Sequence, residues 1–327
     1  MNKIINLVAD IGGTNIRLAL SDKKNNLTNI ETYQCTKFKN LFEVISQYLT
    51  EHKIQNRSIN ACLAIACPID NDLISMTNLP WKFSQKDLKQ QLNLNSLTLI
   101  NDFTAIAMAI PFLSNDQKVQ IGSGESTPSK AISVCGPGTG LGVATLIPVD
   151  NKWHCLGGEG GHMDFAPVDT LEIKILHYLQ GVKNRVSYEQ LLSGYGLEQI
   201  YQALIVLDSY PTKRNAAVDK LTAAQISARA VANSCSTCYQ ALSLFCRVLG
   251  SFAGNLALMA NSLGGVYIAG GIVPKFIEFI QQSDFRSRFE AKGRLTPLTQ
   301  QSPTYVITEK QPGLLGASAY LNQFNCC

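Results

Sequence analysis

The sequence predicts an α/β protein of two lobes that face a cleft. Segments 4–20 and 131–147 share one pattern, in which an apolar strand, a glycine-rich turn and a second apolar strand follow one another. The length of 327 residues corresponds to about two domains. We therefore expect a small α/β domain of residues 1–111 plus about 303–327, and a large α/β domain of residues 112–302.

The first unit continues with short helices and strands. We expect a helix over 41–49, where apolar residues recur at helical spacing, strands over 61–65 and 97–100, and a helix over 105–110. Pro111 stops or kinks this last helix, because proline lacks an amide hydrogen and its ring clashes with the preceding turn. The boundary between the domains is therefore placed near Pro111.

The second unit is mainly helical after its opening hairpin. We expect helix over 171–263, with an interruption around 208–215, and then strands over 266–269 and 305–307. A terminal helix begins at about Leu315, and this C-terminal segment returns to the first domain.

Residues 248–273 carry no charge and have the length of a membrane span. Asn255, Asn261 and the pair Gly264-Gly265 divide this stretch into a helix-like half and a strand-like half. We interpret it as a buried core helix followed by a buried strand, with a membrane span as the alternative.

The composition indicates a well-buried enzyme. Hydrophobic residues make up 46% and charged residues 16%, below the roughly 25% charged residues of typical soluble domains. The net charge is +4 without any run of five basic residues, so neither nucleic acid nor a membrane is expected as a partner. Residues 4–9 are too few for a signal-peptide core, and ten cysteines then indicate reduced thiols and a cytoplasmic location.

Cys235 and Cys238 form a C-x-x-C pair in a helix-like segment. No second such pair and no histidine pair accompanies it, so we interpret the two residues as ordinary thiols, with half of a zinc site as the alternative. The sequence predicts no role for the terminal residues Cys326 and Cys327.

Three glycine turns at strand ends predict a phosphate-binding site. They are 10–14, 136–142 and 270–271. Glycine lets backbone amides approach an anion and converge on it, and although one such turn is weak evidence, three are more specific. The chain has no G-x-x-x-x-G-K-[ST] motif, which excludes a P-loop. A strand instead of a helix follows 136–142, so a dinucleotide-binding fold is not expected.

Asp10 directly precedes the first of these turns. Mg²⁺ prefers few carboxylates together with phosphate oxygens, so Asp10 is expected to hold Mg²⁺ through its water shell. The alternative is an Asx-type turn residue.

Five polar residues predict a sugar site, because each sugar hydroxyl both donates and accepts hydrogen bonds. They are Asn101, Asp102, Glu159, His162 and Glu189. Asp102 is the candidate general base, since its carboxylate can take a proton from an attacking primary hydroxyl. Four of the five have a structural alternative: a helix cap for Asp102, a loop carboxylate for Glu159, a core histidine for His162 and an exposed helical glutamate for Glu189.

Nearly the whole chain resembles the bacterial glucokinase family, in its branch without a zinc motif. The matching segments are 10–20, 64–68, 76–78, 100–105, 138–142, 158–162, 192–194, 268–273 and 312–316. The resemblance implies the hexokinase and actin-like ATPase fold (ribonuclease H-like), with a small and a large α/β lobe around a cleft, and a homodimer.

The resemblance also implies roles for the site residues. Glucose would be contacted by Asn101, Asp102, Glu159, His162 and Glu189, with Asp102 as the base. ATP would be bound by Ala9, Asp10, Ile11, Gly12, Gly13, Thr14, Gly138, Thr139, Gly140, Gly270 and Gly271, with the adenosine end near the last two.

The expected reaction is the first step of glycolysis, ATP-dependent phosphorylation of D-glucose at O6. One alternative is a kinase for mannose, fructose or an N-acylhexosamine. A sugar-responsive regulator would need a DNA-binding extension before the first strand, for which residues 1–3 leave no room. A filament or chaperone ATPase would have no use for the polar residues Glu159, His162 and Glu189.

Overall fold

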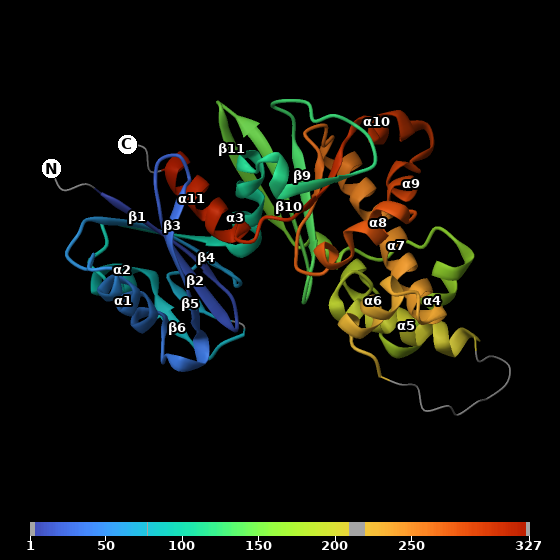
Figure 1. Cartoon of the computed structure of the whole chain (residues 1–327), viewed down its shortest axis with the longest axis horizontal. Helices are drawn as coiled ribbons and strands as arrows, with labels where there is room; N and C mark the ends of the chain where they lie inside the picture. The colour runs from blue at the N-terminus through green and yellow to red at the C-terminus, as the bar shows by residue number, and fades with distance from the viewer. Residues whose placement is uncertain (1–3, 77, 209–219, 325–327) are drawn as a thin grey trace. The chain divides into compact units, whose positions relative to one another are not determined.

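The computed structural model describes residues 4–76, 78–208 and 220–324. The chain divides into two compact units (Figure 1). Unit 1 comprises the residues up to Ser114, Val149–Gly157 and the residues from Glu309 onward, and unit 2 comprises Asn115–Pro148 and Gly158–Thr308. The sequence-based boundaries at 111 and about 303 differ from these by a few residues, and they leave Val149–Gly157 in the large domain.

The segment Val149–Gly157 belongs with unit 1 for a physical reason. The backbone amide of Trp153 donates to Gln323 Oε1 at 2.8 Å, and Gln323 Nε2 donates to the Trp153 carbonyl at 2.7 Å. This two-way contact fastens the segment to the C-terminal helix. A pattern of apolar residues does not reveal a contact between residues so distant in the sequence.

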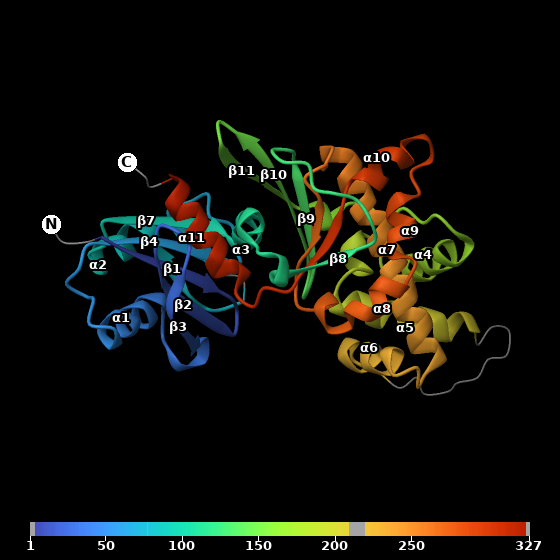
Figure 2. The ribbon, with the colours of Figure 1, turned by 45° about the horizontal axis from the view of Figure 1, so that its top comes forward.

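Unit 1 contains a sheet in the order β3-β2-β1-β4-β7 (Figure 2). The first three strands are antiparallel neighbours, and β1, β4 and β7 run parallel. The strands are β1 (Ile5–Ile11), β2 (Asn15–Ser21), β3 (Leu27–Gln34), β4 (Ile59–Ile65) and β7 (Ser96–Asn101). The other elements are α1 (Leu41–Glu51), the hairpin β5 (Leu73–Ser75) and β6 (Lys82–Ser84), α2 (Gln85–Gln91), α3 (Asp102–Ala109) and α11 (Pro312–Phe324).

Alternation along β1 gives unit 1 a core on each face of this sheet. Leu7 and Ile11 pack into a cluster with α1 residues, whereas Val8 packs into a second cluster with α3 and α11 residues. The helices α3 and α11 cross closely, because a Cβ at Gly316 would lie 1.6 Å from the Ala105 carbonyl oxygen. Glycine is therefore required at this crossing.

Unit 2 repeats the strand arrangement of unit 1. Its strands β10, β9, β12 and β13 lie in this order, with an antiparallel hairpin followed by parallel neighbours, and β8 pairs with β13. The bounds are β8 (Lys118–Ile121), β9 (Ile132–Pro137), β10 (Leu141–Val149), β12 (Val266–Ile268) and β13 (Thr304–Ile307), and β11 (Lys152–Gly158) follows β10 along the chain. Two α/β units that each contain a glycine hairpin are present as predicted, but in unit 2 the unpredicted strand β8 precedes the hairpin.

The helical part of unit 2 has more breaks than predicted. The helices are α4 (Thr170–Val182), α5 (Gly194–Asp208), α6 (Ala223–Val231), α7 (Ser236–Ala260), α8 (Ile277–Gln282), α9 (Phe285–Glu290) and α10 (Thr296–Gln301). Residues 183–193 interrupt the expected helix and carry Glu189 in a short 3₁₀ turn, Tyr188–Gln190. Most of the predicted interruption over 208–215 lies outside the described residues.

The uncharged stretch 248–273 is a core helix end followed by a strand, as predicted. Helix α7 ends at Ala260, its C-cap Asn261 has a left-handed φ of 48°, and β12 follows the glycine pair. Within the described chain, α7 is the one helix long and apolar enough to cross a membrane. Most of its apolar window is buried inside the protein, which is typical of a core helix.

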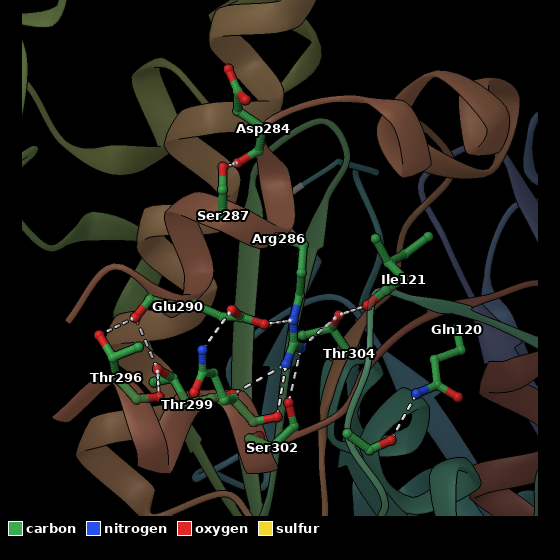
Figure 3. A network of polar contacts seen from close by, with 12 residues as sticks. Gln120, Ile121, Asp284, Arg286, Ser287, Glu290, Thr296, Thr299, Ser302 and Thr304 are labelled. Carbon is green, nitrogen blue, oxygen red and sulfur yellow. Dashed lines mark hydrogen bonds and ion pairs between the residues drawn. The ribbon is translucent and has the colours of Figure 1, made fainter.

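Arg286 fastens α9 to the end of α10 and to β13. Its Nε donates to Glu290 Oε1 at 2.6 Å and its Nη1 donates to the Ser302 carbonyl at 2.9 Å (Figure 3). The guanidinium also reaches Thr304 Oγ1 and the carbonyls of Thr299 and Gln300. These contacts use the planar fork of donors that arginine alone supplies.

We expect Arg286→Ala to lower the free energy of unfolding by about 3–5 kcal/mol, because removing one partner leaves Glu290 and several carbonyls without theirs in a mostly buried site. Urea denaturation measures the change. Arg294→Ala, at an exposed position of the same region, is the matched control and should change stability by less than about 0.5 kcal/mol. Equal losses in the two variants would contradict a special role for Arg286.

Candidate active site

The β1–β2 turn presents backbone amides. The Gly12 amide donates to the Asn15 carbonyl at 3.1 Å and so closes the turn itself. The amides of Gly13 and Thr14 donate to no acceptor among the described residues. A Cβ at Gly13 would lie 2.7 Å from Asn78 Cβ, so only glycine fits there. The turn therefore offers the donors of Gly13 and Thr14 to an anion, whereas the sequence prediction also included Gly12.

Asp10 lies beside this turn and pairs with its cross-strand neighbour Arg17. Arg17 Nη1 is 3.2 Å from Asp10 Oδ2. The carboxylate thus contacts Arg17, not the turn amides that an Asx turn would use. Burial raises the pKa of Asp10, and Arg17 opposes this rise only in part. A Cβ at Gly313, in the first turn of α11, would lie 2.8 Å from Asp10 Cγ.

The neighbours of Asp10 in β1, Ala9 and Ile11, are also among the residues predicted to bind ATP. The side chains of Ala9 and Ile11 are completely buried in the core of unit 1. Any contact that they make with a nucleotide therefore runs through their backbone.

The parallel register brings Asn101 and Asp102 to the same sheet edge as Asp10. Asp10 pairs with Ala64, which pairs with Ile100 on β7. The carboxyl ends of parallel strands meet at one edge, where ligands bind in open α/β sheets. Sequence spacing alone did not place these residues together, and the register does.

Asn101, not Asp102, is the N-cap of α3. Its Oδ1 accepts hydrogen bonds from the amides of Phe103 at 2.9 Å and Thr104 at 3.3 Å. The cap alternative for Asp102 is therefore wrong. Because the cap occupies Oδ1, Asn101 can offer a ligand only the hydrogens of its amide nitrogen.

Asp102 is the first residue of α3 and is partly buried. Its Oδ1 accepts from the Phe103 amide at 2.8 Å. Burial raises the pKa of this carboxyl, the Phe103 amide opposes the rise, and the charge of Asp10 adds to it. A carboxylate with a raised pKa holds a proton more readily, which is the property that a general base needs.

In unit 2, the β9–β10 turn presents a second set of backbone amides. The Gly138 amide donates to the Gly140 carbonyl at 2.8 Å, and the Gly138 carbonyl accepts from the Gly194 amide at the start of α5. The amides of Thr139 and Gly140 donate to no acceptor within the described chain. This turn therefore resembles the β1–β2 turn. In each, one glycine amide donates within the turn, and the amides of the next two residues can bind an anion.

Glu189 connects this turn to His162. Its Oε2 accepts from the Leu141 amide at 2.9 Å, and its Oε1 is 3.8 Å from His162 Nε2. A Cβ at Gly140 would lie 2.6 Å from Glu189 Oε2, so a larger residue there would displace the carboxylate. Glu189 is therefore not an ordinary exposed helical residue.

His162 and Glu159 lie in the loop after β11. The His162 side chain is 54% exposed, which excludes the core-histidine alternative. The His162 amide donates to the Glu159 carbonyl at 2.9 Å, and a Cβ at Gly161 would lie 2.0 Å from the Leu141 carbonyl oxygen. This close packing fixes the loop against β10. Glu159 is exposed, and the loop-carboxylate alternative stays open for it.

The third glycine turn, Gly270-Gly271, lies against the second. Gly270 has a φ of 85°, and a Cβ there would lie 2.3 Å from the Pro137 carbonyl oxygen. Gly271 has open space around it. In unit 2, both glycine turns therefore lie close to Glu189 and the His162 loop.

The site residues fit a weakly held magnesium ion. No group of three or more His, Cys, Asp or Glu residues that could hold a metal exists in the described part of the chain. Asp10 is a single, partly exposed carboxylate beside free turn amides. Mg²⁺ that keeps several waters and binds mainly to phosphate oxygens needs no more than this.

Sequence reasoning missed several supporting residues. Arg17, Asn78 and Gly313 shape the surroundings of Asp10 and the first turn, and Leu141 holds Glu189 through its amide. The resemblance covers all four residues, but no local pattern marks Asn78 and Gly313 as neighbours of the turn.

The comparisons with known proteins point to one family. A glucokinase family profile matches residues 7–324. The chain is 64% identical over 321 residues to the glucokinase of Colwellia psychrerythraea (strain 34H / ATCC BAA-681), covering 98% of this chain and 97% of that one.

Solved structures share the fold. The crystal structure of a glucokinase from an Antarctic psychrotroph aligns with a TM-score of 0.87 and 37% identity, covering 97% of this chain and 98% of that one. A Streptomyces griseus ROK family glucokinase, solved with glucose and AMPPNP, aligns with a TM-score of 0.59 and 17% identity over 97% and 98% of the chains, which shows the fold alone. The predicted fold class, that of the actin-like ATPase kinases, is confirmed.

Proposed function

Because this chain belongs to the glucokinase family, we propose that it transfers the γ-phosphoryl group of ATP to O6 of D-glucose, forming ADP and glucose 6-phosphate. Membership of the family makes it a kinase that acts on glucose. We assign the residues of both units to this one reaction. The observation that carries the chemistry is the half-buried Asp102 carboxylate with its raised pKa, in the same unit as Asp10 and the first phosphate turn.

Asp102 acts as the general base in this proposal. It accepts the proton of the 6-hydroxyl while O6 attacks the γ-phosphorus. The Phe103 amide and the Asn101 side chain hold the carboxylate in one orientation. Asn101 thus positions the base, and the remaining hydrogen of its side-chain amide can contact a sugar hydroxyl.

Glu159, His162 and Glu189 recognise the sugar ring, together with Asn101 and Asp102. Glu189 and His162 stand 3.8 Å apart, so a hydroxyl that bridges them can donate to the carboxylate and accept from the imidazole. The bond from the Leu141 amide fixes Glu189 for this purpose. The same glutamate thereby couples the sugar residues to the β9–β10 turn.

The ATP phosphates are bound by the amides of Gly13, Thr14, Thr139 and Gly140. These four amides point to no acceptor among the described residues, as an anion site requires. Gly270 and Gly271 would admit the adenosine end, because Gly271 has no neighbour that a larger group would displace. Asp10 would hold Mg²⁺ through water, and the ion would neutralise charge on the phosphates.

We further propose that the enzyme works in the cytoplasm as a homodimer, at the entry of glucose into glycolysis. Family membership supports these proposals, and the eight described cysteines are all free thiols, in keeping with a reducing compartment. Size-exclusion chromatography with light scattering measures the oligomeric state.

A coupled assay tests the reaction. With ATP and Mg²⁺, glucose should be phosphorylated at a kcat/KM at least about 100-fold above mannose, fructose or N-acetylglucosamine, because a site that binds each hydroxyl rejects analogues that leave polar groups unpaired. Chelating the metal should abolish turnover, and excess Mg²⁺ should restore it. Faster turnover of another hexose would assign the enzyme to that sugar, and turnover that survives chelation would exclude the role of Asp10 with Mg²⁺.

A further inference from the structure

A tight turn joins α6 to α7 and places Cys235 directly at the start of α7. Helix α6 ends at Val231 with Ala232 as its C-cap, and Asn233 follows with a left-handed φ of 50°. The Asn233 amide donates to the Ala230 carbonyl and the Ser234 amide to the Arg229 carbonyl, both at 3.0 Å. This pair of bonds is the Schellman motif, which ends a helix in a fixed direction. The next residue, Cys235, therefore has a defined position.

Cys235 is the N-cap of α7 through its sulfur. Its backbone is extended, and its Sγ accepts from the Cys238 amide at 3.2 Å. Ser, Thr, Asp and Asn are the usual caps, and a neutral thiol is a weak acceptor by comparison. An ionised sulfur accepts such bonds far better, so this position favours the thiolate at a helix N-terminus.

The pKa values of the two thiols shift in opposite directions, and only one of the two side chains is exposed. Burial raises the pKa of the Cys235 thiol, but hydrogen bonds from the Cys238 side chain and amide, with Arg229 nearby, bring that pKa below its ordinary value. Burial raises the pKa of Cys238 instead, and its hydrogen bond to Cys235 adds to the rise. Cys235 is partly exposed and Cys238 is completely buried.

We propose that Cys235 and Cys238 form an oxidation site, in which Cys235 reacts with peroxide and Cys238 resolves the product as a reversible disulfide. The Cys235 thiolate attacks one oxygen of hydrogen peroxide, forming a sulfenic acid and releasing hydroxide. The Cys238 sulfur then displaces the sulfenic oxygen as water, giving the disulfide. The zinc alternative has no support, because no further ligands join the pair among the described residues.

The geometry permits this bond. Residues three apart on a helix have Cβ atoms about 5–6 Å apart, whereas a disulfide needs about 3.5–4.5 Å. Cys235 is the cap and not a helical residue, so its dihedral angles can adjust without breaking α7. Oxidation removes the thiolate acceptor of the Cys238 amide, so the disulfide should loosen only the first turn of the helix.

Two measurements on the full-length reduced protein test the proposal. Iodoacetamide labelling at neutral pH, followed by peptide mass spectrometry, should modify Cys235 at least about tenfold faster than Cys155, a partly exposed cysteine whose pKa burial raises to about 11. Treatment with hydrogen peroxide should then yield a peptide that contains the Cys235–Cys238 disulfide, which dithiothreitol reverses. Peptide mapping separates this product from the other cysteines.

Variants assign the two roles. Cys238→Ser should leave a sulfenic acid on Cys235 that dimedone traps, and Cys235→Ser, which keeps a good cap, should leave Cys238 unmodified by peroxide. Thermal melting checks that both variants fold. Labelling of Cys235 no faster than Cys155 in the wild-type protein would overturn the proposal. So would peroxide treatment that oxidises Cys235 while Cys238 stays a free thiol.

Discussion

Replacing Asp102 with asparagine should lower kcat by about 10²–10⁴-fold and leave glucose binding nearly unchanged. The amide keeps the size and the hydrogen bond to the Phe103 amide, but it cannot accept the proton of the attacking hydroxyl. The variant should fold normally, because burial and the charge of Asp10 both disfavour the ionised carboxyl that the substitution removes. Steady-state kinetics, glucose titration and thermal melting measure the three quantities.

The pH profile separates this role from a structural one. Turnover needs the carboxylate, so kcat should fall as the pH falls through the pKa of Asp102, which lies above that of an ordinary aspartate. This limb should disappear in Asp102→Asn. Asp87→Asn, at an exposed position in the first turn of α2, is the matched control and should retain wild-type kcat. A loss of less than roughly tenfold in Asp102→Asn would rule out a base at this position.

The fold was predictable where local chemistry determines it. Both hairpins and the helix that begins at Leu41 follow from apolar periodicity, and the uncharged stretch after Val248 was interpreted correctly from its asparagines and glycines. Strand β3 was missed because every one of its side chains is partly or fully exposed and most are polar. Helix α2 was missed because only Leu88 in it is buried, too little for a periodic signal.

Residue types and their places along the chain suggested the candidate site residues, but not the contacts between them. Strand ends and glycine turns suggested Asp10, Asp102 and the β9–β10 turn. The alternative that made Asp102 the cap of α3 named the wrong neighbour, since Asn101 and Asp102 are both good caps and sequence cannot rank adjacent candidates. The bond from the Leu141 amide to Glu189 joins residues 48 positions apart, and only the folded chain shows it.

Glu189→Gln should weaken glucose binding by about 10–100-fold while kcat changes much less. The neutral amide retains a carbonyl that can accept from the Leu141 amide, but it loses the charge that strengthens hydrogen bonds to sugar hydroxyls and the electrostatic contact with His162. Hydrogen bonds to a charged group contribute about 1.5–3 kcal/mol, which corresponds to this range of affinity. Isothermal titration with glucose measures the change.

A second substitution, in the β9–β10 turn, should displace the Glu189 carboxylate. In Gly140→Ala the new methyl group would lie 2.6 Å from Glu189 Oε2, so the carboxylate must move away from the Leu141 amide, and glucose affinity should fall to a similar extent. Glu278→Gln on the exposed start of α8 and Gly181→Ala, with open space around it in α4, are the matched controls and should bind glucose as the wild type does. If Glu189→Gln and Gly140→Ala both kept the wild-type Kd, Glu189 would hold the β9–β10 turn in place and the sugar would be bound elsewhere.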